Sequence, residues 1–520
     1  MNRFTTLTIL LSLSLLSTTT AATDWPQAAG PNGDFQSNRD GPAEWSIVQS
    51  RNIAWRLTLP ETGQSTPVIS HGKVFFTTMK EVSADTELGK DIVAWCCDAT
   101  NGKVLWQRAI PGKYVARLSG CFSDNSAPPA VTDGKRVVFL NSGGTIICFD
   151  LNGKELWQRK ILSVGRTLPF LSNGRFVFTR QIYPPEPSGS FPHKYKDSPH
   201  DMWTQLHALD MTTGKEVWTS KCGVNMGNAL LPQRLADGRA VAMVGRGGGH
   251  GPPEKPEGVS LVNLDNGETL WTLPLPGFMS TMSYRIRKDV AHIFHGGEHL
   301  SIDALTGQIT RRTSILNEVT TRLWNNGKRV TKQIAIQDSK KRRMITQTSN
   351  LLVGKWHYFR SYTRPYLGRV NVDNGAVEYL ELPLQLARFS KGQDQFQWFV
   401  EPKSKKGTQL KAQAIAPNIL KNSRGFVVFG DKRSTGNGWG HVAAATPSVA
   451  GQNLYVPVMN GTVYVIRWNA EKLDERAIVA INDLGPAGDA YNRASISFAN
   501  GRAFAHTIRE LICIGNSNPE

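Results

Sequence analysis

The sequence predicts an all-β protein, an eight-bladed β-propeller made of four-stranded antiparallel blades. A segment that ends one strand, turns at a glycine and continues into another strand recurs along the chain. A tryptophan follows four of these turns at a similar distance. The chain is also rich in the residues that tight turns and packed β-sheets use, with 48 Gly and 14 Trp among 520 residues.

The four strong copies of the turn segment end at a tryptophan. These residues are Trp106, Trp157, Trp218 and Trp271. Their spacing of about 50 to 60 residues is the length of one four-stranded blade with its loops. The glycine supplies the positive φ that a tight hairpin needs, and the tryptophan on the next strand can fill the gap between neighbouring sheets. We therefore predict that the four tryptophans are structural anchors buried between blades.

Four weaker units complete the ring. They lie at 280–309, 343–377, 445–480 and 494–514, and the turn segments of the first two, at 300–309 and 370–377, lack the tryptophan. They bring the count to eight, with a seven-bladed ring as the alternative. Two insertions, at 181–203 and 381–444, interrupt the rhythm of the repeats.

The last unit contains one strand fewer than the others. The segment Ile53–Leu57 has β-forming character and precedes the first complete unit. Pairing this segment with the last blade would close the ring and remove two unpaired sheet edges. We expect this closure, and we expect a chain that begins at Asp40 to remain folded.

The N-terminus predicts export. Arg3 precedes an apolar stretch at 7–16, and small residues at 20–22 offer a cleavage site. The apolar stretch is short for a bilayer-spanning helix. We interpret residues 1–22 as a signal peptide and residues 23–520 as one propeller that is periplasmic or secreted, with no transmembrane segment after cleavage.

The chain has a formal net charge of +18, and part of the excess is clustered at 340–343 and 403–411. A basic surface attracts acidic partners, such as an anionic polymer of the cell envelope. Export argues against nucleic acid as that partner. The alternative is that the basic runs are solvated loops without a partner.

One glycine-rich segment suggests a ligand contact. Arg246 and His250 flank three glycines, which permit close approach of the backbone to a ligand. Pro252 and Pro253 follow, so no helix N-terminus can support phosphate binding there. We predict ligand binding by Arg246 and His250, with an ordinary inter-strand loop as the alternative.

The histidines and cysteines favour structural roles. His292 and His295 would point to opposite sides of one strand, which suits a hairpin better than a metal site, while Glu298 could meet His295 across the turn that precedes His299. No metal site is predicted. Cys96 and Cys97 lie in mid-strand and would point to opposite faces as buried thiols. Disulfide pairing among the six cysteines cannot be deduced from sequence. They are Cys96, Cys97, Cys121, Cys148, Cys222 and Cys513.

The anchor Leu209–Trp218 and the segment Trp25–Gly33 resemble the PQQ-like (pyrroloquinoline quinone) repeat propellers, in particular the BamB-type and the secreted PQQ-binding-like families. The resemblance covers roughly residues 25–515. It implies two kinds of relative. BamB is an outer-membrane lipoprotein that helps to assemble barrel proteins, whereas quinoprotein dehydrogenases hold pyrroloquinoline quinone and Ca²⁺ in the funnel and are known for a ring of adjacent cysteines packed on the cofactor.

Common catalytic motifs are absent from the sequence, among them the Gly-x-Ser-x-Gly elbow, His-Glu-x-x-His and the Walker loop. We therefore expect a monomeric, non-catalytic scaffold of the cell envelope that binds a protein or an anionic polymer and needs no cofactor. The alternative is a quinoprotein dehydrogenase that depends on pyrroloquinoline quinone and calcium.

Overall fold

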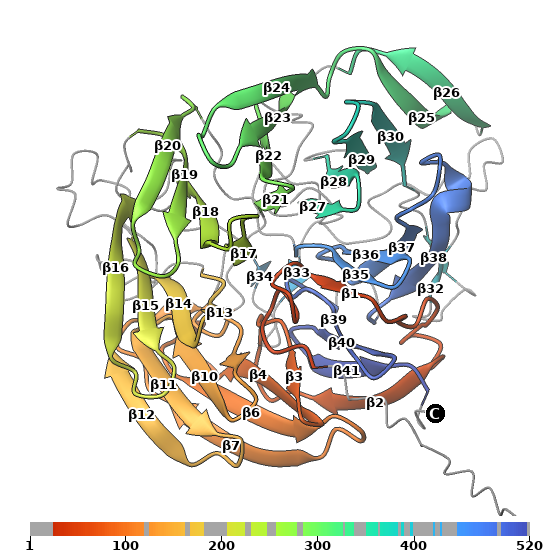
Figure 1. Cartoon of the computed structure of the whole chain (residues 1–520). Helices are drawn as coiled ribbons and strands as arrows, with labels where there is room; N and C mark the ends of the chain where they lie inside the picture. The colour runs from red at the N-terminus through yellow and green to blue at the C-terminus, as the bar shows by residue number, and fades with distance from the viewer. Residues whose placement is uncertain are drawn as a thin grey trace, which may run out of the picture.

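The structure is a computed structural model. It describes residues 24–118, 124–161, 167–180, 205–223, 230–246, 256–277, 284–325, 328–336, 350–361, 365–382, 386–388, 396–398, 420–421, 427–428, 445–485 and 490–516. Within these residues, eight antiparallel sheets with four strands each stand as blades around a central axis (Figure 1). The predicted eight-bladed propeller is confirmed.

In each of the first four blades the strands follow one another from the axis to the rim. Blade 1 contains β3 (Val68–Ser70), β4 (Lys73–Met79), β6 (Ile92–Asp98) and β7 (Val104–Ile110). Blade 2 contains β9 (Val131–Thr132), β10 (Arg136–Asn141), β11 (Thr145–Asp150) and β12 (Glu155–Lys160). Blade 3 contains β13 (Phe170–Ser172), β14 (Arg175–Arg180), β15 (Gln205–Asp210) and β16 (Glu216–Gly223). Blade 4 contains β17 (Gln233–Arg234), β18 (Ala240–Arg246), β19 (Gly258–Asn263) and β20 (Thr269–Pro274).

The last four blades complete the ring. Blade 5 contains β21 (Arg285–Arg287), β22 (Val290–His295), β23 (Glu298–Asp303) and β24 (Ile309–Ser314). Blade 6 contains β27 (Asn350–Val353), β28 (Trp356–Arg360), β29 (Tyr366–Asn371) and β30 (Val377–Glu381). Blade 7 contains β35 (Ser448–Ala450), β36 (Asn453–Pro457), β37 (Thr462–Arg467) and β38 (Ile478–Asp483). Blade 8 contains β39 (Ser497–Ala499), β40 (Arg502–His506), β41 (Glu510–Ile514) and β2 (Ile53–Thr58).

The N-terminal strand β2 closes the ring as the outer strand of blade 8. It runs antiparallel to β41, with Ile53 opposite Ile514 and Thr58 opposite Glu510. The pairing confirms the predicted closure by Ile53–Leu57. Because the first strand and the last three strands share one sheet, neither end of the repeat array exposes an unpaired edge.

Several short strands lie outside the four-stranded core of the blades. The hairpin of β25 (Val319–Asn325) and β26 (Lys328–Ile334) extends blade 6 at the rim, where β25 runs parallel to β30. The strand β1 (Gln36–Ser37) pairs in parallel with β35, and β5 (Leu88–Gly89) pairs with β8 (Ala116–Arg117). The predicted insertion at 181–203 lies outside the described residues. Most of the insertion at 381–444 also lies outside them, apart from residues 381–382 and the short strands β31 (Leu386–Arg388), β32 (Phe396–Trp398), β33 (Leu420–Lys421) and β34 (Val427–Val428).

A tryptophan on the outer strand fastens each of five seams between neighbouring blades. The Trp106 indole of blade 1 donates a hydrogen bond to the Leu151 carbonyl of blade 2, at 3.2 Å. The same ring lies against Gly153, where an added Cβ would come within 2.9 Å of it. A larger side chain in that turn would push the two blades apart. The equivalent tryptophan and glycine pairs are Trp55 with Gly102, Trp157 with Gly214, Trp218 with Gly267 and Trp271 with Gly307.

The four predicted anchors differ in burial. Trp106 and Trp218 are each 8% exposed, whereas Trp157 and Trp271 are only partly buried. All four donate the indole N–H to a carbonyl of the following blade. Their location between blades agrees with a structural role.

Arg311 takes the place of the tryptophan in blade 5. It lies four residues after the turn glycine Gly307, as Trp218 lies four residues after Gly214. Its guanidinium donates to the carbonyls of Val372 and Asp373 in blade 6. The seam between blades 5 and 6 is therefore fastened by a charged group.

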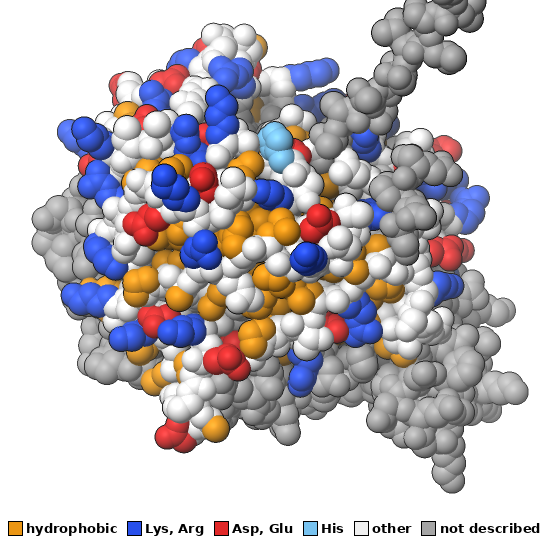
Figure 2. Space-filling view, turned by 90° about the horizontal axis from the view of Figure 1, so that it is seen from below, with side chains coloured by type: hydrophobic (Ala, Val, Ile, Leu, Met, Phe, Trp, Pro, Cys, Tyr) orange, Lys and Arg blue, Asp and Glu red, His pale blue; other side chains and the backbone are white. Residues whose placement is uncertain are grey.

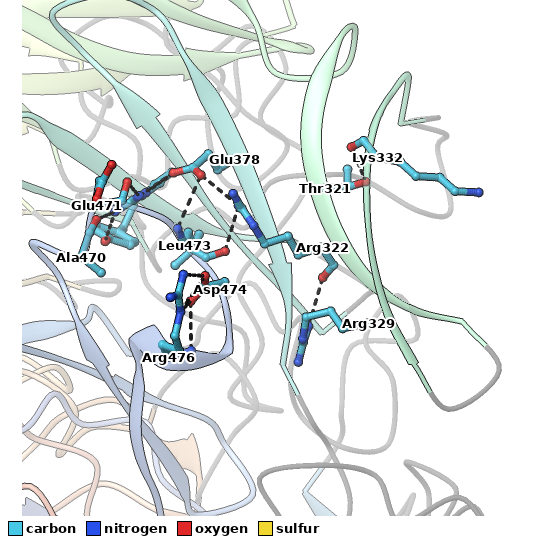
Figure 3. A network of polar contacts seen from close by, with 12 residues as sticks. Thr321, Arg322, Arg329, Lys332, Glu378, Ala470, Glu471, Leu473, Asp474 and Arg476 are labelled. Carbon is cyan, nitrogen blue, oxygen red and sulfur yellow. Dashed lines mark hydrogen bonds and ion pairs between the residues drawn. The ribbon is translucent and has the colours of Figure 1, made fainter.

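Between blades 6 and 7, buried ion pairs replace the tryptophan (Figure 3). Glu378 on β30 accepts hydrogen bonds from Arg369 on β29 and Arg322 on β25, at 2.7 and 2.9 Å. Both arginines also donate to carbonyls of blade 7, at Ala470 and Leu473. The Arg369 guanidinium lies 3.6 Å from the centre of the Trp356 ring, which adds a cation–π contact.

The segment 24–37, which we call the axial plug, lies across the centre of the ring. Trp25, Ala28 and Phe35 are each at most 1% exposed. The plug contacts the inner region of every blade. The contacts, from blade 1 to blade 8, are Trp25 with Ile69, Pro26 with Thr132, Gln27 with Leu171, Gly33 with Pro232, Asp34 with Arg285, Gln36 with Leu352, Phe35 with Val449, and Trp25 with Phe498.

The chain continues from the plug into the seam between blades 7 and 8. The Trp45 indole is fully buried and donates to the Asp483 carbonyl at 3.0 Å. Asp483 in turn accepts hydrogen bonds from the Ser46 hydroxyl and the Val48 amide, while burial raises the pKa of its carboxyl. The segment before Ile53 thus packs into this seam, and the expectation that a chain beginning at Asp40 remains folded stays a prediction.

Replacement of Trp218 by alanine should lower the free energy of unfolding by about 3–5 kcal/mol, because it removes a large ring and its hydrogen bond from the seam. Val217 is the matched control, because it is adjacent and 46% exposed, so its replacement by alanine should cost little. Denaturant unfolding measures both variants. A loss below about 0.5 kcal/mol at several anchor tryptophans would contradict the assigned role.

A chain that begins at Asp40 should unfold at a lower temperature than one that begins at Thr23, because it lacks the plug that contacts all eight blades. A chain that begins at Thr58 also lacks β2 and should aggregate. Thermal unfolding and size-exclusion chromatography compare the three chains. Equal melting temperatures for the first two chains would show that the plug does not stabilise the ring.

Candidate functional site

The two ends of the ring differ in the connections that they carry. One end, the turn face, holds the turns between the first and second strands and between the third and fourth strands of each blade, such as those at Gly72 and Gly102. The other end, the loop face, holds the remaining connections. The axial plug pairs with inner strands near the turn face, beside Ser70 and Thr132.

The described strand ends that flank the predicted insertions lie at the loop face. Residues 181–203 connect the second and third strands of blade 3, and residues 381–444 connect blade 6 to blade 7. The segment with Arg246 and His250 connects the second and third strands of blade 4. In repeat proteins, insertions that share one face often mark the binding face.

Buried polar residues surround the axis at the loop face. The Gln64 side-chain oxygen accepts hydrogen bonds from the Asp124 amide at 3.2 Å and from the Arg493 guanidinium at 3.0 Å. The Asp124 carboxylate accepts from the amide and the hydroxyl of Ser126. These residues precede the inner strands of blades 1, 2 and 8, so their network joins three blades at the loop face.

Hydroxyl groups join the inner strands in the same way. Ser448 donates to the Ile496 carbonyl at 2.8 Å, and Thr77 donates to the Ser126 carbonyl at 2.7 Å. Each bond links one blade to the next. These two seams are thus polar near the axis, whereas most outer seams depend on tryptophan.

A cleft of about 450 Å³ opens on the loop face between blades 7 and 8. Its lining combines two arginines, one glutamate and two threonines with apolar residues and one glycine. Lining residues include Arg56, Thr58, Leu484, Gly485, Thr507 and Arg509. Arg56 forms an ion pair with Glu510 at 2.7 Å, and Arg509 is exposed. The cleft could accept a polar or acidic segment of a partner.

The structure places Arg246 inside blade 4. Its Nε donates to the Pro256 carbonyl at 3.0 Å, and one Nη lies 3.1 Å from the Cys222 sulfur. The side chain is 5% exposed and ties the end of β18 to its neighbours. His250 lies outside the described residues, so ligand binding by this pair stays a prediction.

Cys96 and Cys97 point to opposite faces of β6. Cys96 packs in the core between blades 1 and 2, and Cys97 packs in the core shared with blade 8. Burial raises the pKa of each thiol to about 12. Both are free thiols, as predicted, and this separation does not fit a ring of adjacent cysteines packed on a cofactor. The other free cysteines are Cys148, Cys222 and Cys513, while Cys121 lies outside the described residues.

The predicted histidine hairpin is present, and it contributes to a cluster that the sequence did not reveal. His292 and His299 face blade 6 and are almost fully buried, whereas His295 lies opposite Glu298 at the turn. His299 Nε2 lies 3.0 Å from His357 Nδ1 of blade 6. Among the described residues, no group of three or more His, Cys, Asp and Glu side chains is placed to hold a metal ion.

Outer strands expose apolar side chains at the rim. Leu105, Leu156 and Val217 each precede an anchor tryptophan and are 43% to 46% exposed. Figure 2 shows a band of hydrophobic side chains at the rim, with Lys and Arg side chains on both sides of it. In the described part of the chain, no helix has the length and apolar character needed to cross a membrane.

Solved structures with related folds include dehydrogenases. A europium-containing methanol dehydrogenase is 11% identical, with a TM-score of 0.53 and coverage of 95% of this chain and 98% of that chain. The quinohemoprotein alcohol dehydrogenase from Comamonas testosteroni is 13% identical, with a TM-score of 0.51 and coverage of 94% and 80%. These two likenesses show a shared propeller fold alone. BamB from Moraxella catarrhalis is 12% identical, with a TM-score of 0.37 and coverage of 74% and 95%.

A comparison with curated protein sequences gives no match. The family model described as outer membrane protein assembly factor BamB, a PQQ-like repeat family, matches residues 48–172 and 200–354. These segments make up more than half of the chain, and the chain therefore belongs to this family.

Proposed function

We propose that the chain is an exported, non-catalytic scaffold of the cell envelope, periplasmic or secreted, that binds a protein or an anionic polymer through its loop face. The proposal rests on the difference between the turn face and the loop face of the ring. The axial plug fills the centre near the turn face, and the cleft and the strand ends that flank the insertions lie at the loop face. A partner that approaches along the axis therefore meets the loop face.

The chemistry of the loop face supports a polar partner. Arg493 is partly exposed there, and the buried Gln64 side chain, which also accepts from the Asp124 amide, holds the Arg493 guanidinium in place at 3.0 Å. Arg509 adds an exposed positive charge at the cleft. The family description, outer membrane protein assembly factor, favours a protein partner over a polymer.

The proposal includes no cofactor. The vicinal cysteines lie in two separate inter-blade cores, so a quinone cannot pack on both of them. Purified protein mixed with pyrroloquinoline quinone and Ca²⁺ should acquire no dye-linked alcohol or sugar oxidation. Oxidation that depends on both additions would contradict the proposal and establish the dehydrogenase alternative.

Reversal of charge at the cleft should weaken partner binding. The variant Arg509→Glu places a negative charge where an acidic segment would dock, and we expect about tenfold weaker retention of the partner. Lys154→Glu is the matched control, because Lys154 is exposed beside a turn-face glycine, Gly153. Quantitative mass spectrometry of proteins captured from envelope extract compares both variants with the unmodified chain.

Equal capture by Arg509→Glu and the unmodified chain, with loss in Lys154→Glu, would move the binding surface to the turn face and contradict the proposal. Thermal unfolding of each variant shows that its fold is intact before capture is compared.

A further inference from the structure

Three histidines are buried together in the seam between blades 5 and 6. His292 on β22 is 3% exposed, and His299 on β23 and His357 on β28 are 0% exposed. The ring centres of His292 and His299 are 5.4 Å apart, and those of His299 and His357 are 5.2 Å apart. Phe294 and Phe359 pack around them, so water has little access to the cluster.

One hydrogen-bonded chain fixes the protons of two of these rings. His357 Nε2 lies 3.2 Å from the Asn350 side-chain oxygen, which can only accept, so Nε2 donates. Neutral His357 must then accept at Nδ1, where His299 Nε2 donates at 3.0 Å. His299 Nδ1 is left as an unprotonated acceptor. It has no hydrogen-bond partner among the described residues, and the same is true of His292 Nδ1.

Charged groups around the cluster oppose a further positive charge. Arg311 and Arg287 lie near His292, and Asp373 is engaged by Arg287 at 2.6 Å. At the outer end of the same hairpin, Arg312 pairs with Glu298 at 2.8 Å, next to His295. A proton on a ring of the cluster would therefore add positive charge to a buried site that already has partly exposed arginines beside it.

We propose that the seam between blades 5 and 6 is an acid-sensitive joint, which separates before the other seams of the ring when the pH falls. Three features coincide there and nowhere else among the described seams: a cluster of three buried histidines, a ring nitrogen without a hydrogen-bond partner on two of them, and Arg311 in place of the anchor tryptophan. Protonation of the cluster adds charge to a seam that is already fastened by a cation.

The coupling between proton binding and opening of the seam gives the direction in which pH changes its stability. Burial lowers the pKa of His292 to about 4 and the pKa values of His299 and His357 well below the ordinary value of 6.5. An opened seam would expose these rings to water and restore a pKa of about 6.5. Opening then takes up protons, so the stability of the seam is full above pH 6.5 and is lost as the pH falls toward 4.

The effect is large enough to measure. For His292 alone, a fall from about pH 7 to about pH 4.5 should favour the opened seam by about fiftyfold. His506 is also buried with a pKa lowered to about 4, but it stands alone in the seam between blades 8 and 1, where Trp55 provides the anchor. That seam should open second.

Hydrogen exchange measured by mass spectrometry on the mature chain tests the order of opening. After correction for the intrinsic pH dependence of exchange, protection of β22–β24 and β27–β29 should fall by at least about tenfold more than protection of the other blades between pH 7 and pH 4.5. An equal fall in all eight blades, or a fall that begins at blades 8 and 1, would overturn the proposal.

A variant pair separates the histidines of this seam from acid effects elsewhere. His292→Leu removes one titrating ring without breaking the hydrogen-bonded chain, and it should clearly reduce the extra loss of protection in blades 5 and 6. His506→Gln is the matched control and should leave that loss unchanged. A response of blades 5 and 6 that is the same in His292→Leu as in the unmodified chain would also overturn the proposal.

Discussion

The contact between an outer-strand tryptophan and the turn of the following blade is the interaction on which the ring depends. A blade is a small sheet with two apolar faces, and it can cover them only with its two neighbours. The indole of Trp106 spans that gap, and its N–H satisfies a carbonyl that the turn leaves free. Gly153 serves both sides of the contact, because its φ of 83° forms the turn and its missing side chain makes room for the ring.

Two seams use charged groups for the same purpose, with different physical consequences. Arg311 reaches the Val372 carbonyl, the counterpart of the carbonyls that accept from the tryptophans elsewhere. Glu378 holds two arginines that reach blade 7. Buried charges are costly to desolvate, and they stabilise a structure only when every partner is present. A tryptophan seam tolerates changes in pH, whereas a seam that contains titratable or charged groups responds to them.

The ring could be predicted from the sequence because its unit recurs within about 60 residues. The regular spacing of Trp106, Trp157 and Trp218 predicted the length of one blade. The missing strand of the last unit indicated that Ile53–Leu57 completes it. Cys96 and Cys97 could be placed on opposite faces because side chains alternate along a strand.

Features made by residues far apart could not be predicted. The axial plug has no period, because each of its residues meets a different blade. His299 and His357 are 58 residues apart, and nothing in either local sequence signals their contact. Arg246 was singled out for its glycine-rich surroundings, but burial of its side chain depends on Cys222, which belongs to the preceding blade.

The entry of the N-terminal segment into the last blades imposes an order on folding. Trp45 bonds to Asn482 across 437 residues of sequence, and β2 pairs with β41 at the other end of the chain. The segment around Trp45 and β2 therefore waits for blades 7 and 8 before it completes its native contacts, and until then blades 1 to 6 form an open arc. Contacts of such long range make folding slow and leave unpaired edges exposed in the meantime. A chain of this design would rely on protection from aggregation until its whole length is available.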